Sequence, residues 1–188
     1  MILEAIVTTR NDDGTPNISP MGPEVNESTW DTFILKPFHT ANTYQNLKRT
    51  GQGVLHVTDD VKLFVDGAIS RFEDLPAMRP AEMVQGDVLT DCCRFYEFTT
   101  LSVDDSSERI EIQCQTVQSG ELRPFWGFNR AKHAVLEAAI LATRIHLIKK
   151  SQLQDDLARL GSIVRKTAGL AEKEAFHKLA LFFEEKLP

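Results

Sequence analysis

The sequence of 188 residues lacks long apolar runs, paired cysteines and any excess of basic charge. A helix that spans a bilayer needs about 20 mostly apolar residues, and no stretch reaches that length, so we expect no membrane segment. The start, Met1–Glu4, has no basic stretch of the kind found in a secretory signal peptide. Three cysteines, two of them adjacent (Cys92 and Cys93), fit neither a disulfide framework nor a CxxC redox or zinc site. We therefore expect reduced, structural cysteines in a cytoplasmic protein.

The charge is acidic overall and changes sign along the chain. With 21 basic and 27 acidic residues the net charge is −6, which disfavours non-specific nucleic-acid binding because that depends on a basic surface. Residues 1–126 carry 10 basic and 20 acidic groups, whereas residues 127–188 carry 11 and 7. The net charges are therefore −10 and +4, and such a change indicates a change of architecture. We predict two domains, 1–126 and 127–188.

The motifs of several enzyme classes are missing. The sequence contains no P-loop, no GxGxxG, no HExxH and no nucleophile elbow. His133 and Glu137 are four residues apart on an expected helix, but no third metal ligand is placed nearby. A hydrogen-bonded pair is the better interpretation, so we expect no metal. No residue has the pattern of an obligatory catalytic acid or base, which leaves the catalytic residues unknown.

Strand patterns dominate the first 125 residues. Period-two alternation and turn residues predict strands at 2–9, 15–21, 32–35, 53–58, 92–103 and 109–118. Asn11–Gly14 predicts a tight turn, and 104–107 predicts a hairpin between the last two strands. Pro16 and Pro20 cannot donate to a ladder, so strand 15–21 must lie at a sheet edge or soon break away. Residues 71–91 are expected to be a long irregular excursion.

Helical spacing predicts two short helices within the strand-rich part and three longer ones after it. The first covers 40–49 and ends at Gly51, and the second begins after Asp59 as its N-cap. After N-cap Asn129, residues 130–150 form a helix that is apolar on most sides, which indicates more than one packed neighbour. Ser151 with Gln154 predicts a capping box for the next helix, and the last begins near 170. The fold class is therefore α+β.

The stretch Lys36–Asn46 is the most informative one for chemistry. It places a cation, threonine hydroxyls and free backbone amides at the start of a short helix, an arrangement that favours a phosphate. The alternative is ordinary capping, because Thr and Asn are common at helix starts.

The order of these segments resembles the FMN-binding split barrels, the superfamily of flavin reductases and pyridoxamine-phosphate oxidases. The similarity lies in residues 6–10 followed by 13–22, then 40–47 and the strand 53–58. More closely, the chain resembles a branch found in archaea and some bacteria. Its marks are 58–61 with Phe64-Val65, and 128–132 leading into 137–144. The resemblance covers nearly the whole chain and implies a split β-barrel of Greek-key type followed by a C-terminal three-helix segment.

The resemblance also implies a binding site for FMN. The isoalloxazine ring would lie along the strand that ends at Gly22, and the phosphate would lie after the third strand. The residues implied for the ring are Asn17, Ser19, Pro20, Met21 and Gly22. Those implied for the ribityl chain and the phosphate are Arg10, Lys36, Thr40, Thr43 and Asn46, with Phe38 or Tyr44 packing on the flavin.

The function implied by the resemblance is an FMN-dependent oxidoreductase of the flavin reductase type. It implies a homodimer with each flavin near the subunit interface, a small redox substrate such as NAD(P)H, and a place near one-carbon metabolism with a pterin. Two alternatives stay open: a non-catalytic flavin-binding carrier or sensor, and an interaction module without flavin. Arg130, Lys132 and His133, at a helix start, would face an anionic ligand or simply be solvated.

Overall fold

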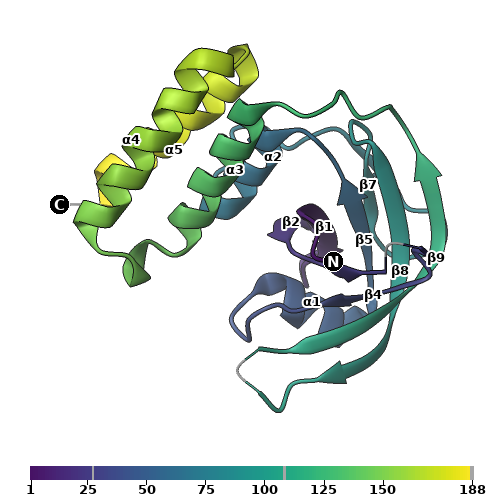
Figure 1. The fold of residues 1–188 in the computed structure, drawn as a ribbon. Helices are drawn as coiled ribbons and strands as arrows, with labels where there is room; N and C mark the ends of the chain where they lie inside the picture. The colour runs from purple at the N-terminus through teal and green to yellow at the C-terminus, as the bar shows by residue number, and fades with distance from the viewer. Residues whose placement is uncertain (27, 108, 187–188) are drawn as a thin grey trace. The chain divides into compact units, whose positions relative to one another are not determined.

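The computed structural model describes residues 1–26, 28–107 and 109–186, which form two compact units (Figure 1). The first unit comprises Met1–Thr58 and Leu75–Phe125, and the second comprises Asp59–Asp74 and Trp126–Pro188. The chain thus crosses between units next to residue 126, where the charge changes sign. It also crosses at both ends of Asp59–Asp74, a segment that we expected to belong to the strand-rich domain. The division into domains 1–126 and 127–188 stays a prediction.

The first unit is built on a curled antiparallel sheet. Seven strands pair in the order β2-β1-β5-β8-β9-β4-β3, and β6 pairs with β7 separately. The long strands β8 and β9 curve strongly along their length, which curls the sheet into a half-barrel (Figure 1). The strands are β1 Ala5–Arg10, β2 Pro16–Met21, β3 Glu24–Val25, β4 Thr32–Leu35, β5 Gln52–Val57, β6 Met78–Pro80, β7 Asp87–Leu89, β8 Arg94–Asp104 and β9 Glu111–Glu121.

Most strand predictions are confirmed, and one is wrong. Strand β2 lies at the edge of the sheet, as its two prolines require. Gly14 has a φ of +81° in the tight turn between β1 and β2. The excursion 71–91, however, contains the β6–β7 hairpin, with Met78 opposite Leu89. Strands of three residues are too short to show alternation, and the proline in β6 argued against a strand there.

Helix α1, Asn42–Thr50, packs on the apolar core of this unit. It ends at Gly51, whose φ of +64° confirms the predicted C-terminal glycine. Gly53, the second residue of β5, lies close to the ring of Phe98, since a Cβ there would lie 2.8 Å from Cζ of Phe98. The buried core residues include Val7, Phe33, Leu35, Tyr44, Leu47, Leu55, Phe98, Ile110, Ile112 and Cys114.

His56, in the middle of β5, is fully buried and held in one tautomer. The amide of Leu89 donates to Nε2 at 3.0 Å, so the proton lies on Nδ1, which contacts the carbonyl of Ile6 at 3.3 Å. Burial lowers the pKa of His56 from 6.5 to about 3. The imidazole is therefore neutral in the folded protein throughout the physiological pH range.

We predict that His56 makes the protein less stable in acid. Below pH 6.5 the unfolded state binds a proton at this residue, and the folded state does not until about pH 3. The free energy of unfolding therefore falls by about 1.4 kcal/mol per pH unit in that window from this group alone. The variant His56→Gln should lack this contribution, so urea unfolding at pH 7 and pH 5 should show the wild type losing about 2 kcal/mol more than the variant. Equal losses in both proteins would contradict the prediction.

The second unit is a helical bundle in which α3 is central. It contains α2 Val61–Ile69, α3 Arg130–Thr143, a 3₁₀ turn Ile145–Leu147, α4 Lys150–Thr167 and α5 Leu170–Lys186. Helix α3 contacts α2, α4 and α5, which confirms the prediction of several neighbours. Its buried face is lined by alanines, whose small side chains let three helices approach closely. No helix among the residues described is both long and apolar enough to cross a bilayer.

Three details of the predicted helices are corrected. The N-cap of α2 is Asp60, which accepts from the amide of Lys62, and not Asp59. Helix α3 ends at Thr143, because the chain tightens into the 3₁₀ turn before residue 150. Helix α4 begins at Lys150, and its N-cap Lys149 makes no side-chain capping bond. The capping box predicted at Ser151 is therefore wrong, since that residue already lies in the first turn. The predicted N-cap Asn129 is confirmed, and it accepts from two amides of α3.

Candidate functional site

A buried network of asparagines and threonines ties β1, β2 and α1 together in the first unit. The amide of Asn17 donates to the hydroxyls of Thr9 and Thr43, both at 3.1 Å. The amide of Asn46 donates to the hydroxyl of Thr9 at 3.0 Å and to Oδ1 of Asn11 at 2.9 Å. Three predicted site residues, Asn17, Thr43 and Asn46, are thereby brought together. Because their bonds are internal, they fix the edge strand to the start of the helix.

Among the strands that the structure describes, β2 pairs with β1 alone, so its outer edge faces no other strand of the sheet. Prolines are tolerated in an edge strand where their nitrogen points away from the ladder, so Pro16 and Pro20 mark the outward direction. Ile18 lies two residues from each of these prolines along the strand, so its amide also points outward. The hydroxyl of Ser19 makes a long 3.5 Å contact with the carbonyl of Pro20. This edge thus offers an amide and a hydroxyl, and it ends at Met21 and Gly22.

The N-terminus of α1 lies at the other end of this network. Its N-cap is Ala41, which has no side chain able to cap, and its first turn contains no acidic residue. The first amides of a helix need partners from outside the helix, and they carry the positive end of its dipole. Thr40, exposed one residue before the N-cap, adds a hydroxyl. The chemistry of these donors suits an anion.

The two cations predicted for a phosphate both have carboxylate partners. Lys36 lies between Glu24, 2.8 Å away, and Glu111, 3.0 Å away, and these carboxylates raise the pKa of its ammonium group. Arg10 makes a two-point ion pair with Asp87, at 2.7 and 3.1 Å. An anion near either side chain would share the cation with these carboxylates.

The two predicted aromatic residues differ in exposure. Tyr44 is buried in the core, and its hydroxyl donates to Asp105 at 2.8 Å while it accepts from Lys48 at 2.9 Å. The same contacts raise the pKa of Lys48 and lower that of Asp105. Phe38 is half-exposed, with the guanidinium carbon of Arg109 5.0 Å from its ring centroid. Of the two rings, only that of Phe38 presents a solvent-facing surface.

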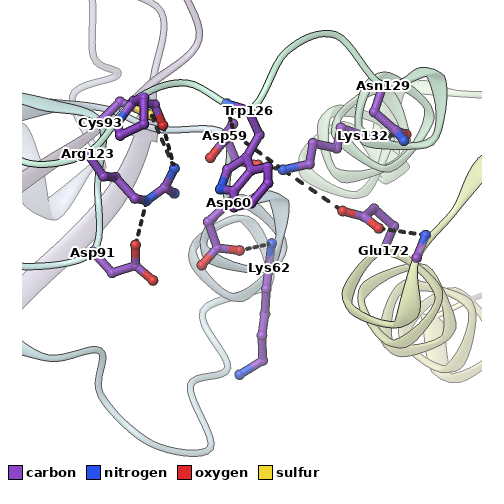
Figure 2. Close-up of polar contacts among 12 residues, drawn as sticks. Asp59, Asp60, Lys62, Asp91, Cys93, Arg123, Trp126, Asn129, Lys132 and Glu172 are labelled. Carbon is purple, nitrogen blue, oxygen red and sulfur yellow. Dashed lines mark hydrogen bonds and ion pairs between the residues drawn. The ribbon is translucent and has the colours of Figure 1, made fainter.

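In the second unit, Lys132 lies among acidic groups that the sequence did not point to. Its ammonium group donates to the carbonyl of Asp59 at 2.7 Å and lies 3.5 Å from its carboxylate and 4.0 Å from that of Glu172 (Figure 2). The Asp59-Asp60 pair in the sequence was the one available signal. Arg130 and His133 are exposed, and the His133 ring stacks on Phe128.

The cysteines confirm their predicted structural character. All three are buried and free of disulfides, and burial raises the pKa of Cys92 to about 12 and also raises that of Cys114. Arg123 reaches the sulfur of Cys93 at 3.5 Å while it pairs with Asp91 (Figure 2). Within the ranges that the structure covers, no group of three His, Cys, Asp or Glu side chains is placed to hold a metal.

The curled antiparallel half-barrel followed by helices defines an α+β protein with a flavin reductase-like split barrel. The chain belongs to the DUF447 family, described as proteins of unknown function, whose N-terminal domain matches residues 3–123 and whose C-terminal part matches residues 129–180. The chain is similar to the FMN-bound protein MM1853 from Methanosarcina mazei, at 22% identity and a TM-score of 0.81. That similarity covers 96% of this chain and 94% of the other.

Two further structures share the barrel at low identity. The 2-nitrobenzoate 2-nitroreductase NbaA of Pseudomonas fluorescens has 18% identity and a TM-score of 0.53, over 63% of this chain and 64% of its own. The flavin reductase of styrene monooxygenase from Pseudomonas putida S12 has 11% identity and a TM-score of 0.50, over 63% and 77%. Both cover about the share of this chain that its first unit occupies.

Proposed function

We propose that the protein binds FMN in its split barrel and acts as an oxidoreductase of the flavin reductase type. The observation that carries this proposal is the bond between Asn17 and Thr43, which holds the edge of β2 next to the uncapped start of α1. A flavin needs donors along its ring and a site for its phosphate, and these two features supply both. The FMN in MM1853 and the reductase activities in the names of the other two proteins support the proposal.

The residues present fit the cofactor. The outward amide of Ile18 and the hydroxyl of Ser19 would serve the ring, with Asn17, Pro20, Met21 and Gly22 completing the edge. The amides that begin α1 and the hydroxyl of Thr40 would hold the phosphate, and Arg10 and Lys36 would balance its charge. Thr43, Tyr44 and Asn46 would position the helix, and Phe38 would lie against the flavin. When bound, the flavin would supply the redox chemistry, and the protein its orientation.

The proposal extends to a homodimer with a flavin near the subunit interface and to NAD(P)H or a pterin as the small redox substrate. The second candidate function is a non-catalytic flavin carrier or sensor. Hydride transfer to a flavin needs no catalytic acid or base, so the candidate residues described are compatible with both functions. Anaerobic mixing with NADH and with NADPH separates the two, because a reductase should lose its flavin absorbance. A flavin that keeps its absorbance with both nucleotides indicates the carrier or sensor.

The cofactor site is tested by Lys36→Ala and Thr40→Ala. We expect purified protein to show FMN absorbance, and each substitution to weaken FMN binding at least about tenfold, because a hydrogen bond to a charged group contributes about 1.5–3 kcal/mol. The Lys36 substitution also leaves Glu24 and Glu111 unbalanced beside the phosphate. Lys173→Ala, an exposed lysine on α5, is the control and should bind FMN normally. The dissociation constant is measured by quenching of FMN fluorescence. Unchanged constants in both variants would contradict the phosphate placement, and protein that takes up no FMN would contradict the function.

A further inference from the structure

Two aromatic side chains at the start of the helical unit are unusually exposed. Trp126 is 84% exposed and Phe128 is 91% exposed. Full burial of such side chains removes roughly 150–250 Å² each from water, so together they expose about 300–400 Å². An exposed apolar patch of that size commonly marks an interaction site.

The backbone that carries these rings is fixed, so their exposure is not that of a loose loop. The amide of Trp126 donates to Oδ2 of Asp59 at 3.1 Å. Asn129 accepts from the amides of Ala131 and Lys132, and its own amide donates to the carbonyl of Thr167 at 3.1 Å. The segment 126–128 is therefore held at both ends. We call it the aromatic segment.

The side chains around the aromatic segment favour a large acidic partner. Leu170, which begins α5 three residues after Thr167, is 74% exposed and extends the apolar surface. Exposed basic side chains on the adjoining helix ends give this surface a basic rim: Arg130, Arg165, Lys166 and Lys173.

The exposure of the rings also excludes a small ligand. Rings exposed to this degree line no concave pocket of the kind that small ligands need. Asn129 already caps two amides of α3, which disfavours a simple anion site there. Protruding aromatic residues are typical anchors of protein interfaces.

The first unit carries a surface with the complementary character. Two irregularities in the β8–β9 ladder leave Leu101 and Val117 outside the pairing register, and these residues are 55% and 40% exposed. Bulges of this kind redirect side chains. On the same ribbon Asp104 and Glu111 are exposed, and hydrogen bonds from Ser106 lower the pKa of Asp104, which keeps it charged. The residues up to 126 also carry the net charge of −10.

We propose that the aromatic segment of one subunit docks on the β8–β9 ribbon of a second copy of the chain. Each subunit has both surfaces, so a two-fold dimer makes the contact twice. In such a dimer each subunit buries its aromatic segment, about 300–400 Å², in one contact and its ribbon in the other. Together with the surrounding rims, this reaches the roughly 800 Å² per partner of a standard interface. The inference rests on the homodimer proposed above and identifies its surface.

Light scattering and sedimentation of the full chain over a range of concentrations test this surface. The wild type should be a dimer, and Trp126→Ala/Phe128→Ala should raise the dimer dissociation constant at least a hundredfold, since aromatic anchors dominate interface energies. Leu101→Lys, on the opposing ribbon, should have a comparable effect. Leu147→Ala removes a side chain that is 73% exposed, in the 3₁₀ turn after α3, and should leave the dimer intact. Circular dichroism should show all four proteins folded, because the substituted side chains are exposed.

The outcomes separate this surface from the proposed function. A monomeric wild type, or an aromatic variant that dimerises as tightly as the wild type, would overturn the proposal. Loss of the dimer in the aromatic variant and in Leu101→Lys, with Leu147→Ala unaffected, would support it. FMN absorbance recorded on the same samples reports cofactor binding independently, so a dimer without flavin contradicts the function and supports the surface.

Discussion

Phe98→Ala is expected to lower the free energy of unfolding of the first unit by about 4 kcal/mol. Truncation of a buried phenylalanine typically costs about 3–5 kcal/mol, as lost burial plus the cavity left behind. Phe98 is fully buried in β8. Its ring meets that of Phe33 edge-on at 5.2 Å and lies against the backbone of Gly53. Strand β5 has no side chain at Gly53 that could move into the cavity, so the site cannot collapse easily. Urea unfolding followed by circular dichroism measures the loss.

Two further variants control for this interpretation. Phe38→Ala removes the same side chain from a half-exposed position and should cost less than about 1 kcal/mol, because little buried surface is lost. Phe98→Leu keeps most of the volume and should recover a large part of the stability. If Phe38→Ala proved as costly as Phe98→Ala, the cavity explanation would be wrong, because the two positions differ mainly in burial.

Local sequence patterns predicted most of the elements because each depends on a local physical requirement. The prolines of β2 permit only an edge position, and Gly51 supplies the left-handed residue after α1. The partner of α2 could not be predicted in this way. Its apolar face requires a partner but does not specify one, and Val61, Val65 and Ile69 pack in the core of the helical unit. For that reason Asp59–Asp74 was expected with the strands.

The candidate site shows the same division between local and distant information. The predicted residues around α1 lie close together because they are adjacent in the sequence or on paired strands. The carboxylates that hold Lys36 come from Glu24 on β3 and Glu111 on β9, and it is the pairing of β4 with these two strands that brings them to Lys36. Asp59 was taken for a helix cap, and its contact with Lys132, 73 residues away, follows only from the packing of the helices.

Removal of the Lys178 ammonium group should lower the free energy of unfolding of the helical unit by about 3 kcal/mol. It donates to the buried carboxylate of Asp66 at 2.7 Å and to the carbonyl of Arg71 at 2.8 Å. Lys178→Met would leave Asp66 with Lys62 at 3.7 Å as its remaining cation among the contacts described. A buried charge that loses its partner typically costs about 3–5 kcal/mol, and the distant lysine offsets part of that loss. Lys173→Met, on the exposed side of the same helix, is the matched control.

A second substitution identifies the cause of the expected loss. Asp66→Asn removes the buried charge, so the double variant Asp66→Asn/Lys178→Met should be more stable than Lys178→Met alone. The pair joins α2 to α5, so hydrogen exchange in Lys178→Met should rise first in the amides of α2. That result would identify this ion pair as one reason why α2 belongs with the C-terminal helices although its sequence lies among the strands. If Lys178→Met and Lys173→Met were equally stable, the apolar face of α2 alone would hold the helix in place.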